Sequence, residues 1–541
     1  MLLHPANSDS LLANSGGTRR TKRHRLVMTV LVVCVGSSAQ FGFATGSLNN
    51  LEPVIHNARL TPSEPPVTLL QWSLIVGGFG IGGLLGALGV HGASERLGHR
   101  RVLLYNNAFV LTASALLVHG TSWWMLAVGR VLIGIAASVA TTAAPLYLAE
   151  LSPRASRAAV GTAHQLGITG GLLLAHALTT TPFSAYFAEG APQQWRRLFL
   201  VPLIGAALEL LLLPRCPESP SWLYRTQGSS AALSTLCKLR GVDSTAAHIE
   251  RLRMERAASD DEQAGGNGGS GGGNGVGGGN GGGGGVLWDA PARLTLAELF
   301  CSRALRTRLV VAVVLQLSMQ LSGIDAIFYY GTLTLRATAG VAPPQLQLAT
   351  TALAALNVVL TLLAVDVMDR AGRRALLLRA WAGMAVGYVV LTLALFAARY
   401  GDGGDPGDGG DGGDLGTHGA ALARVVALCA MAAILVAFAL GPGCVAWFVV
   451  AELFPPHARA AAMSLGVTIN WLANVTVALG FPVLHRALGP AAFAPFAASA
   501  AAFGLFTLRY VPETARRSHD GIANDFSRVD FWMRGVHRES C

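Results

Sequence analysis

The segment Glu95-Arg96-Leu97-Gly98-His99-Arg100-Arg101 returns in the second half of the chain as Asp369-Arg370-Ala371-Gly372-Arg373-Arg374. Two further charged motifs are repeated in the same order. They are Glu150-Leu151-Ser152-Pro153, which returns as Glu452-Leu453-Phe454-Pro455, and Pro217-Glu218-Ser219-Pro220, which returns as Pro512-Glu513-Thr514. Every copy lies at the end of a long apolar run. A duplicated set of apolar runs and charged loops is typical of membrane transporters built from two related halves.

The composition also indicates a membrane protein, because 52% of the 541 residues are hydrophobic and only 13% are charged. A soluble chain of this length needs more charge to cover its surface. Apolar runs of about 20 residues, enough to cross a ~30 Å hydrocarbon core, recur along the chain. They lie near 26–48, 68–90, 102–122, 124–148, 159–180, 196–214, 308–330, 345–365, 376–398, 422–450, 461–481 and 489–510. Alternating barrel patterning is absent, so the sequence predicts an all-α membrane protein with 12 transmembrane helices in two six-helix halves.

The net charge of +10 is compatible with nucleic-acid binding, but its distribution favours a membrane topology. Basic residues precede the first span and follow the second and the fourth. The loop after the ninth span carries five Asp residues between 402 and 414 and no Lys or Arg. This asymmetry predicts cytoplasmic N- and C-termini and no nucleic-acid partner. The plasma membrane is the expected location.

The spans divide the chain into five expected regions. They are a cytoplasmic tail (1–25), a six-helix half (26–214), a cytoplasmic linker (215–307), a second six-helix half (308–510) and a C-terminal tail (511–541). Helical periodicity between 221 and about 256 predicts short helices beneath the bundle. The Gly-rich tract 265–285 is expected to be a flexible tether.

Catalytic chemistry is not indicated anywhere in the sequence. The seven cysteines are scattered and are expected to be free thiols. We find no metal-ligand cluster, no nucleotide cradle with a strand before it, and no nucleophile constellation. The sequence therefore predicts a protein that is not an enzyme and that has no metal or other cofactor.

Polar and aromatic side chains inside the predicted spans are the candidate substrate site. They are Gln165, Gln316, Gln320, Asp325, Asn357, Trp447, Asn470, Trp471 and Asn474. A neutral hexose offers many hydroxyl groups, which amides recognise by donating and accepting, and an apolar ring face that suits an aromatic side chain. The alternative for any single residue is a hydrogen bond that joins two helices.

With these motifs placed, the chain resembles the sugar porter branch of the major facilitator superfamily, and most closely the facilitative glucose transporters. The resemblance covers roughly residues 26–516. It rests on Gly129-Arg130, Pro145 to Glu150, His164-Gln165-Leu166-Gly167, Pro217 to Pro220, Gln316 to Tyr330, Gly441-Pro442-Gly443, Trp447, Glu452-Leu453-Phe454, Asn470-Trp471 and Pro512-Glu513-Thr514. It implies the major facilitator fold, a site between the halves and D-glucose or a related hexose as the substrate.

The resemblance also implies roles for individual residues. Gln165, Gln320, Asn357, Trp447 and Asn474 match sugar-contacting positions, and Gln316-Leu317-Ser318 matches a triplet of glucose-preferring members. Thr45, Asn49, Tyr329 and Tyr330 match positions near an outer gate. Departures are Met319 in place of Gln, Asp325 in place of Asn and Ala439 in place of Glu, the last resembling a fructose-associated subgroup. Cys444 and Ala446 also replace prolines at a break in the tenth span, where Pro442 and two glycines remain to permit bending.

Asp325 leaves the transport mode open between two alternatives. As a proton carrier it would make the chain a proton-coupled sugar or polyol symporter. As a hydrogen-bonding group it would simply bind a sugar hydroxyl. Symporters resembling this chain use an Asp in the first span, where this chain has Ala44 and no acid between Leu26 and Asn49. We therefore expect a uniporter that works by alternating access.

The repeated charges are expected to form a network that closes the cytoplasmic side through pairs between the halves. Its members are Arg100, Glu150, Arg157, Glu218, Asp369, Arg373, Glu452, Arg459 and Glu513. The alternative is that they only satisfy helix ends and set the topology. A rival of another class is a non-transporting sugar sensor, which the short C-terminal tail makes the weaker interpretation.

Overall fold

The structure is a computed structural model, and it describes residues 19–51, 55, 66–153, 156–180, 194–240, 296–302, 305–339, 343–400 and 414–514. Every regular element in those ranges is helical. Several stretches lie outside the described residues. Among them are 1–18 and 515–541 in the tails, the linker from 241 to 295 with its Gly-rich tract, and the Gly/Asp stretch 401–413.

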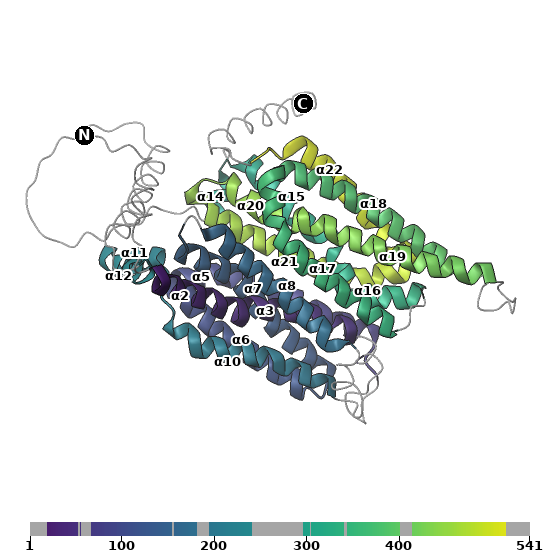
Figure 1. Cartoon of the computed structure of the whole chain (residues 1–541), viewed down its shortest axis with the longest axis horizontal. Coiled ribbons are helices and arrows are strands. Elements are labelled where there is room, and N and C mark those ends of the chain that lie inside the picture. Colours follow the sequence, from purple (N-terminus) through teal and green to yellow (C-terminus); the bar gives the residue numbers. More distant parts are fainter. Residues whose placement is uncertain are drawn as a thin grey trace, which may run out of the picture.

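The first half of the chain forms six spans (Figure 1, purple to teal). The first is one continuous helix made of α2 (Arg19–Val33), the π-helical turn η2 (Cys34–Ser38) and α3 (Ala39–Gly46), followed by the short turn η3 (Asn49–Leu51). The others are α5 (Leu69–Leu97), α6 (His99–His119), α7 (Trp123–Leu151), α8 (Arg157–Thr179), and η5 (Gln194–Leu200) continued by α10 (Val201–Leu212) and η6 (Leu213–Arg215). Two short helices follow, α11 (Pro220–Gln227) and α12 (Ser229–Arg240), in the segment where helical periodicity predicts short helices.

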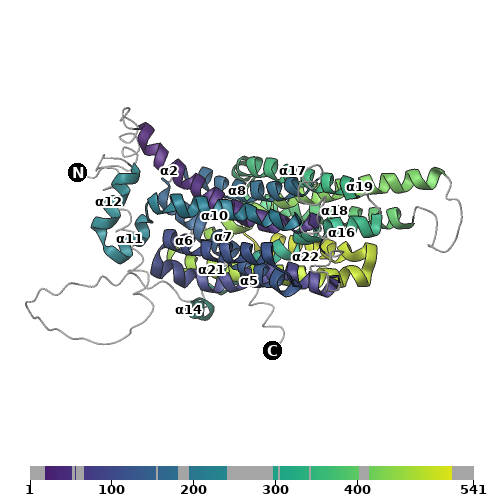
Figure 2. The ribbon, with the colours of Figure 1, turned by 90° about the horizontal axis from the view of Figure 1, so that it is seen from below.

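The second half repeats the plan (Figure 1, green to yellow). A short helix, α14 (Leu296–Cys301), precedes it. The spans are α15 (Arg306–Leu321) with α16 (Ile324–Ala339), α17 (Pro343–Ala371), α18 (Arg373–Tyr400), α19 (Asp414–Leu440) with α20 (Pro442–Leu453), α21 (Pro456–Leu488), and η7 (Gly489–Phe493) with α22 (Ala494–Tyr510). Figure 2 shows the spans of both halves running along a common direction.

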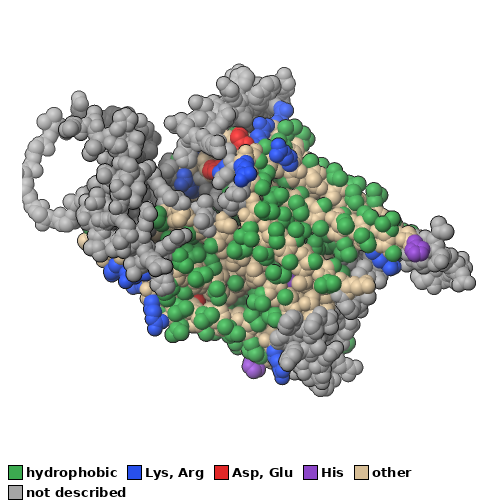
Figure 3. All heavy atoms as spheres, in the orientation of Figure 1, with side chains coloured by type: hydrophobic (Ala, Val, Ile, Leu, Met, Phe, Trp, Pro, Cys, Tyr) green, Lys and Arg blue, Asp and Glu red, His purple; other side chains and the backbone are tan. Residues whose placement is uncertain are grey.

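The lengths of these helices agree with the predicted spans. Within the described residues, ten helical stretches are long and apolar enough to cross a membrane. One of them, Ala461–Tyr510, covers both α21 and α22, and α8 is the twelfth member of the bundle. Hydrophobic side chains cover the middle of the face seen in Figure 3, and Lys and Arg lie toward its edges. The prediction of an all-α, twelve-helix membrane protein in two halves is confirmed.

Two spans are broken, and the sequence predicted only one of the breaks. The tenth span is divided at Gly441, where the sequence placed a bend. The seventh span, predicted as one helix over 308–330, is divided between α15 and α16 at Gly323, whose φ is +82°. A Cβ on Gly323 would lie 2.5 Å from the ring of Phe496, so only glycine fits both this backbone and this contact. Broken helices are tolerated at membrane depth where protein or a cavity satisfies the freed backbone.

We call the end of the bundle that carries the α5–α6 and α17–α18 turns the charged-loop end. At the opposite end the two halves share one hydrophobic core. Leu48 and Leu51 of the first half belong to the same buried cluster as Tyr330 and Phe481 of the second. Asn50 adds a polar link there, because its Nδ2 donates to Thr179 (2.9 Å) and its Oδ1 accepts from Thr350 of the second half (3.1 Å).

The two halves also touch along α5 and α21. Along α5, a Cβ on Gly77 or Gly83 would lie within 2.2 Å of α21 side chains, so the two helices touch there. Nearer the charged-loop end, Ala87 of α5 and Val467 of α21 belong to one buried cluster, so the two helices remain associated there.

Candidate substrate site

Amide side chains of α15 and α21 form a hydrogen-bonded ladder in the second half. Gln316 and Gln320 are one helical turn apart on α15, which places both on the face toward α21. Nε2 of Gln320 donates to Oδ1 of Asn470 at 3.1 Å, and Nδ2 of Asn470 donates to the Gln316 carbonyl at 3.4 Å. The amide of Gln316 is fully buried and has no hydrogen-bond partner among the described residues.

Asp325 lies one step along this ladder, in the first turn of α16 directly after the break at Gly323. Nδ2 of Asn474 donates to its Oδ2 at 2.5 Å and to the Tyr329 hydroxyl at 3.2 Å. Asn474 is buried, whereas Asp325 remains partly exposed. One amide thus connects the acid to the first of the two predicted gate tyrosines.

An aromatic contact joins the halves beside this ladder. The ring of Trp471 on α21 lies edge-on to Phe79 of α5 (5.5 Å) and to Phe41 of α3 (6.2 Å). Gly83 permits this approach, because its Cβ would lie 2.1 Å from the indole. Trp471 is 5% exposed, so in this structure it packs between the halves, and its assignment to a sugar site stays a prediction.

Three of the predicted sugar contacts are not covered by protein. Gln165 on α8 is exposed, and Asn357 on α17 and Trp447 on α20 are partly exposed. Trp447 packs on the edge of the cluster that contains Phe79 and Trp471. Within the described residues, the side chains of Gln165 and Asn357 make no hydrogen bond, which leaves their donors and acceptors available to a ligand.

The predicted outer-gate residues lie toward the end where the halves are joined. Thr45 donates to the Phe41 carbonyl within its own helix (3.0 Å), and Asn49 is buried. The Tyr330 hydroxyl donates to the Ala478 carbonyl at 2.7 Å, and its ring stacks on Phe481. These contacts fix α16 against α21 within the second half, and the gate role stays a prediction.

The repeated charges form the same arrangement twice at the charged-loop end. In the first half, the Arg100 backbone N–H donates to Glu218 at 3.0 Å, and the Arg100 guanidinium lies 3.7 Å from the same carboxylate. In the second half, the backbone N–H groups of Arg373 and Arg374 donate to Glu513 at 2.9 and 3.2 Å. Each Glu therefore accepts from the first turn of a helix, where the helix dipole favours a negative charge.

The glycine before each of these helices is required by the geometry. Gly98 has φ +87° and Gly372 has φ +79°, and a Cβ there would lie 3.0 Å from Glu218 or 2.7 Å from Glu513. The repeat Gly-(His/Arg)-Arg is thus a turn that lets a carboxylate approach a helix N-terminus.

The ion pairs of this network among the described residues join members of one half. His99 lies 3.6 Å from Glu150, and Arg373 lies 3.3 Å from Glu452. Arg459 donates to the Phe454 carbonyl at 3.4 Å. The side chains of Arg157 and Asp369 lie outside the described residues. The predicted pairs between the halves stay a prediction.

Sequence reasoning missed a second intramembrane acid, Glu209 on α10. It is 1% exposed, and its oxygens accept from the Ser37 hydroxyl (2.6 Å) and from Asn107 Nδ2 (3.3 Å). Gly36 in the π-helical turn makes room for it, because a Cβ there would lie 2.5 Å from the Glu209 side chain. A lone acid in the apolar run 201–213 was the signal that would have identified it.

Arg130 on α7 is a second missed residue, although its position was among the matching motifs. It is 1% exposed, donates to the Ala44 carbonyl at 2.8 Å and lies 4.6 Å above the Phe79 ring. A charged group at this depth is costly unless it is paired or hydrogen-bonded. Arg130 thereby places a positive charge beside the aromatic contact between the halves.

Comparisons with known proteins agree with this architecture. The family model described as "Sugar (and other) transporter" matches residues 29–526. Human solute carrier family 2, facilitated glucose transporter member 4, is 33% identical over 520 residues, covering 93% of this chain and 91% of that protein. The rabbit (Oryctolagus cuniculus) member 3 is 33% identical over 516 residues, covering 93% and 92%.

Among solved structures, the proton:xylose symporter XylE bound to 6-bromo-6-deoxy-D-glucose superposes with a TM-score of 0.70. It is 22% identical and the match covers 93% of this chain and 99% of XylE, so the likeness shows the major facilitator fold. The members of the matched family, including the facilitated glucose transporters, are transporters and not enzymes. The family match across most of the chain, together with the relatives above 30% identity, shows that this protein belongs to the sugar (and other) transporter family.

Proposed function

We propose that this protein is a facilitative hexose transporter, a uniporter that moves a glucose-type sugar down its gradient by alternating access. The printed names of its relatives, facilitated glucose transporters at 33% identity, support a sugar substrate. The site chemistry supports it too, because uncharged amides and aromatic rings suit a neutral polyhydroxylated ligand.

The observation that carries the proposal is a contrast between two kinds of amide side chain: some already have a hydrogen-bond partner in the protein, and others have none among the described residues and are open to a ligand. Gln320 and Asn470 are bonded to each other, whereas Gln165 and Asn357 are uncovered and unbonded within the described residues. Groups left open on both halves are what a ligand bound between them requires. The sugar would contact Gln165 in the first half and Asn357 and Trp447 in the second.

The orientation follows from the charge asymmetry, which supports a cytoplasmic charged-loop end and cytoplasmic termini, with the plasma membrane as the expected location. In that orientation the joined end would be extracellular and the charged-loop end would face the cytoplasm. Opening of the joined end would separate Tyr330 and its neighbours from the first half. The same movement would bring the charged motifs of the two halves together. Exposed ion pairs are individually weak, so closing the cytoplasmic side requires the whole network.

Radiolabelled glucose and fructose uptake in transporter-null cells, at two external pH values and with a protonophore, tests the proposal. We expect saturable uptake that is insensitive to pH and protonophore. Uptake that collapses with the proton gradient would make Asp325 the coupling candidate and the protein a symporter. Absence of uptake by protein at the cell surface would favour the non-transporting sensor.

The site assignment is tested by Gln165→Leu and Trp447→Leu, each expected to abolish uptake at normal surface expression. Trp124→Leu is the matched control, since Trp124 is an exposed tryptophan in the first turn of α7, away from the site. Normal uptake by both site variants would remove these residues from the site. A loss with Trp124→Leu would indicate a general defect.

A further inference from the structure

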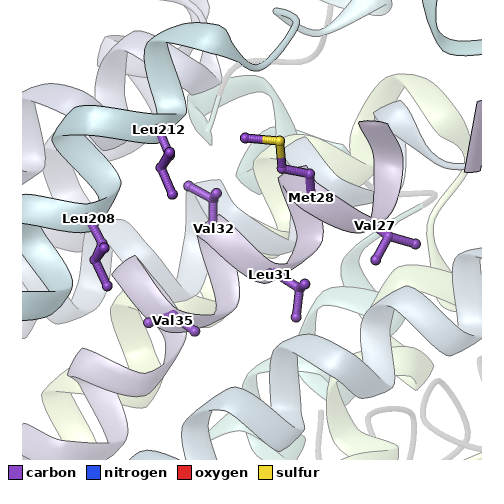
Figure 4. A pocket seen from close by; sticks show the side chains of 7 residues that line it. All are labelled: Val27, Met28, Leu31, Val32, Val35, Leu208 and Leu212. Carbon is purple, nitrogen blue, oxygen red and sulfur yellow. The ribbon is translucent and has the colours of Figure 1, made fainter. Parts of the chain in front are cut away.

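An apolar groove runs along the outside of the first half, between α2 and α10, and belongs to no part of the substrate site. Figure 4 shows the side chains that line it: Val27, Met28, Leu31, Val32, Val35, Leu208 and Leu212. Four come from α2, one (Val35) from the adjoining π-helical turn η2, and two from the last two turns of α10. Val27, Leu31 and Leu208 are each more than 40% exposed, so the groove opens onto the surface that faces lipid.

The dimensions of the groove match one leaflet of a bilayer. Eight residues separate Val27 from Val35, which is about 12 Å of helix at 1.5 Å per residue. Half of a hydrocarbon core is about 15 Å. The groove also begins at the charged-loop end, where α2 starts and α10 finishes. An acyl chain of a phospholipid in that leaflet therefore has the length and the chemistry to occupy it.

The residues around the mouth of the groove carry positive charge. Arg25 precedes Val27 on α2, Arg215 follows Leu212 at the end of η6, and both are exposed. The first turns of α2 read Arg19-Arg20-Thr21-Lys22-Arg23, and neither α2 nor the neighbouring α12 contains an acid. The carboxylate of α10, Glu209, is buried between α10, the π-helical turn η2 and α6, where it accepts from Ser37 and Asn107.

We propose that this groove binds an anionic phospholipid, with an acyl chain between α2 and α10 and its phosphate on Arg25 and Arg215. Juxtamembrane basic residues attract acidic lipids, and basic pockets between transmembrane helices bind their headgroups. The apolar lining alone accepts any acyl chain, so the arginines supply the preference for negative charge. The inference concerns lipid and does not depend on which sugar is carried.

The test uses the full-length protein purified in detergent and a phosphatidylserine with a photoreactive acyl chain. We expect cross-links in peptides containing Val27–Val35 and Leu208–Leu212, with unlabelled phosphatidylserine competing about 30-fold better than phosphatidylcholine, from about two basic contacts. The double variant Arg25→Gln and Arg215→Gln should lose this preference and retain labelling. Arg509→Gln, an exposed arginine near the same end of the second half, is the matched control and should change nothing.

A second variant, Leu208→Trp, fills the groove and should remove labelling from both peptides while the protein stays monodisperse. Equal competition by both lipids, or unchanged preference in the double variant, would overturn the anionic-lipid assignment. Labelling that survives Leu208→Trp would overturn the acyl-chain position. Labelling that appears only after deletion of residues 2–17 would show that the N-terminal segment fills the groove, which also overturns the proposal. Because binding is measured without transport, a failure of the uniporter proposal would leave this result intact.

Discussion

Asp325 and Glu209 are both carboxylic acids inside membrane-spanning helices, and their surroundings separate them. Glu209 is 1% exposed, and each of its oxygens accepts a hydrogen bond, from Ser37 and from Asn107. Asp325 is partly exposed, and within the described residues only its Oδ2 accepts, from Asn474. A carboxyl group has more acceptor capacity than one amide uses.

The difference teaches that open hydrogen-bonding capacity, rather than charge alone, marks an intramembrane acid as a ligand group. Glu209 is enclosed by α2, η2 and α6, and its role is to hold these helices together. Asp325 borders the uncovered residues of the proposed site and retains an oxygen for a sugar hydroxyl. Four predictions test this comparison.

The largest effect is expected from Gly36→Val in the region of Glu209. The new side chain would start 2.5 Å from Glu209 Cβ, far closer than side chains approach one another. We expect a loss of about 3 kcal/mol or more of stability, seen as little or no monodisperse protein. Gly89→Val is the control, because a Cβ there meets nothing within 4 Å. Equal yields of the two variants would contradict close packing around Glu209.

Replacing Glu209 itself should produce the next largest effect. Glu209→Leu leaves the Ser37 hydroxyl and one N–H of the Asn107 amide buried without acceptors, at about 1–3 kcal/mol for each group. Nδ2 of Asn107 still donates to the Leu103 carbonyl at 3.0 Å. We expect a lower melting temperature and fewer transporters, with an unchanged KM in those that remain. Glu209→Gln keeps an acceptor and should restore most of the stability. A changed KM with normal stability would move Glu209 into the transport mechanism.

Asp325 should show the opposite pattern. Asp325→Leu removes a ligand acceptor while Asn474 keeps its bond to Tyr329, so we expect near-normal stability and uptake reduced at least tenfold. Asp325→Asn retains an acceptor and should keep most uptake. Uptake is measured together with thermal melting. If Asp325→Asn abolished proton-driven accumulation that the parent protein displayed, the uniporter proposal would be wrong.

The smallest stability effect is expected at the charged-loop end, where acids are near water. Arg373→Gln removes the 3.3 Å pair with Glu452 but leaves the backbone bond to Glu513, so the stability loss should be below about 1 kcal/mol. We expect a lower maximal uptake rate with little change in sugar binding, measured by equilibrium binding. An unchanged maximal rate would assign these charges to helix ends and topology only.

Much of the fold was predictable because its signals are local in sequence. A helix that spans a membrane must be about 20 apolar residues long, and the charged motifs mark its ends. The turn at Gly98 and its repeat at Gly372 follow from the same logic. The break at Gly323 was missed because Ser322-Gly323 has no proline, and the contact that requires glycine there comes from Phe496, far along the chain.

The candidate site was predictable in composition but not in arrangement. The polar residues of the spans were identified from sequence, and they form two hydrogen-bonded groups, Gln320 with Asn470 and Asp325 with Asn474. Which amides remain open depends on which partners meet across α15, α16 and α21. Periodicity gives the face of a helix, and it does not give the neighbour that the face meets.

The sequence by itself determined the membrane location, the twelve spans, the duplicated halves and the polar residues available for a sugar. These properties depend on the transfer of single segments from water to lipid, which each segment's own side chains decide. Only the tertiary structure decided that Trp471 packs against Phe79, that Glu209 is enclosed while Asp325 is not, and that the halves meet at the end opposite the charged loops. Those properties depend on contacts between residues far apart in the chain, because burial and hydrogen-bond satisfaction are set by the neighbours that folding brings together.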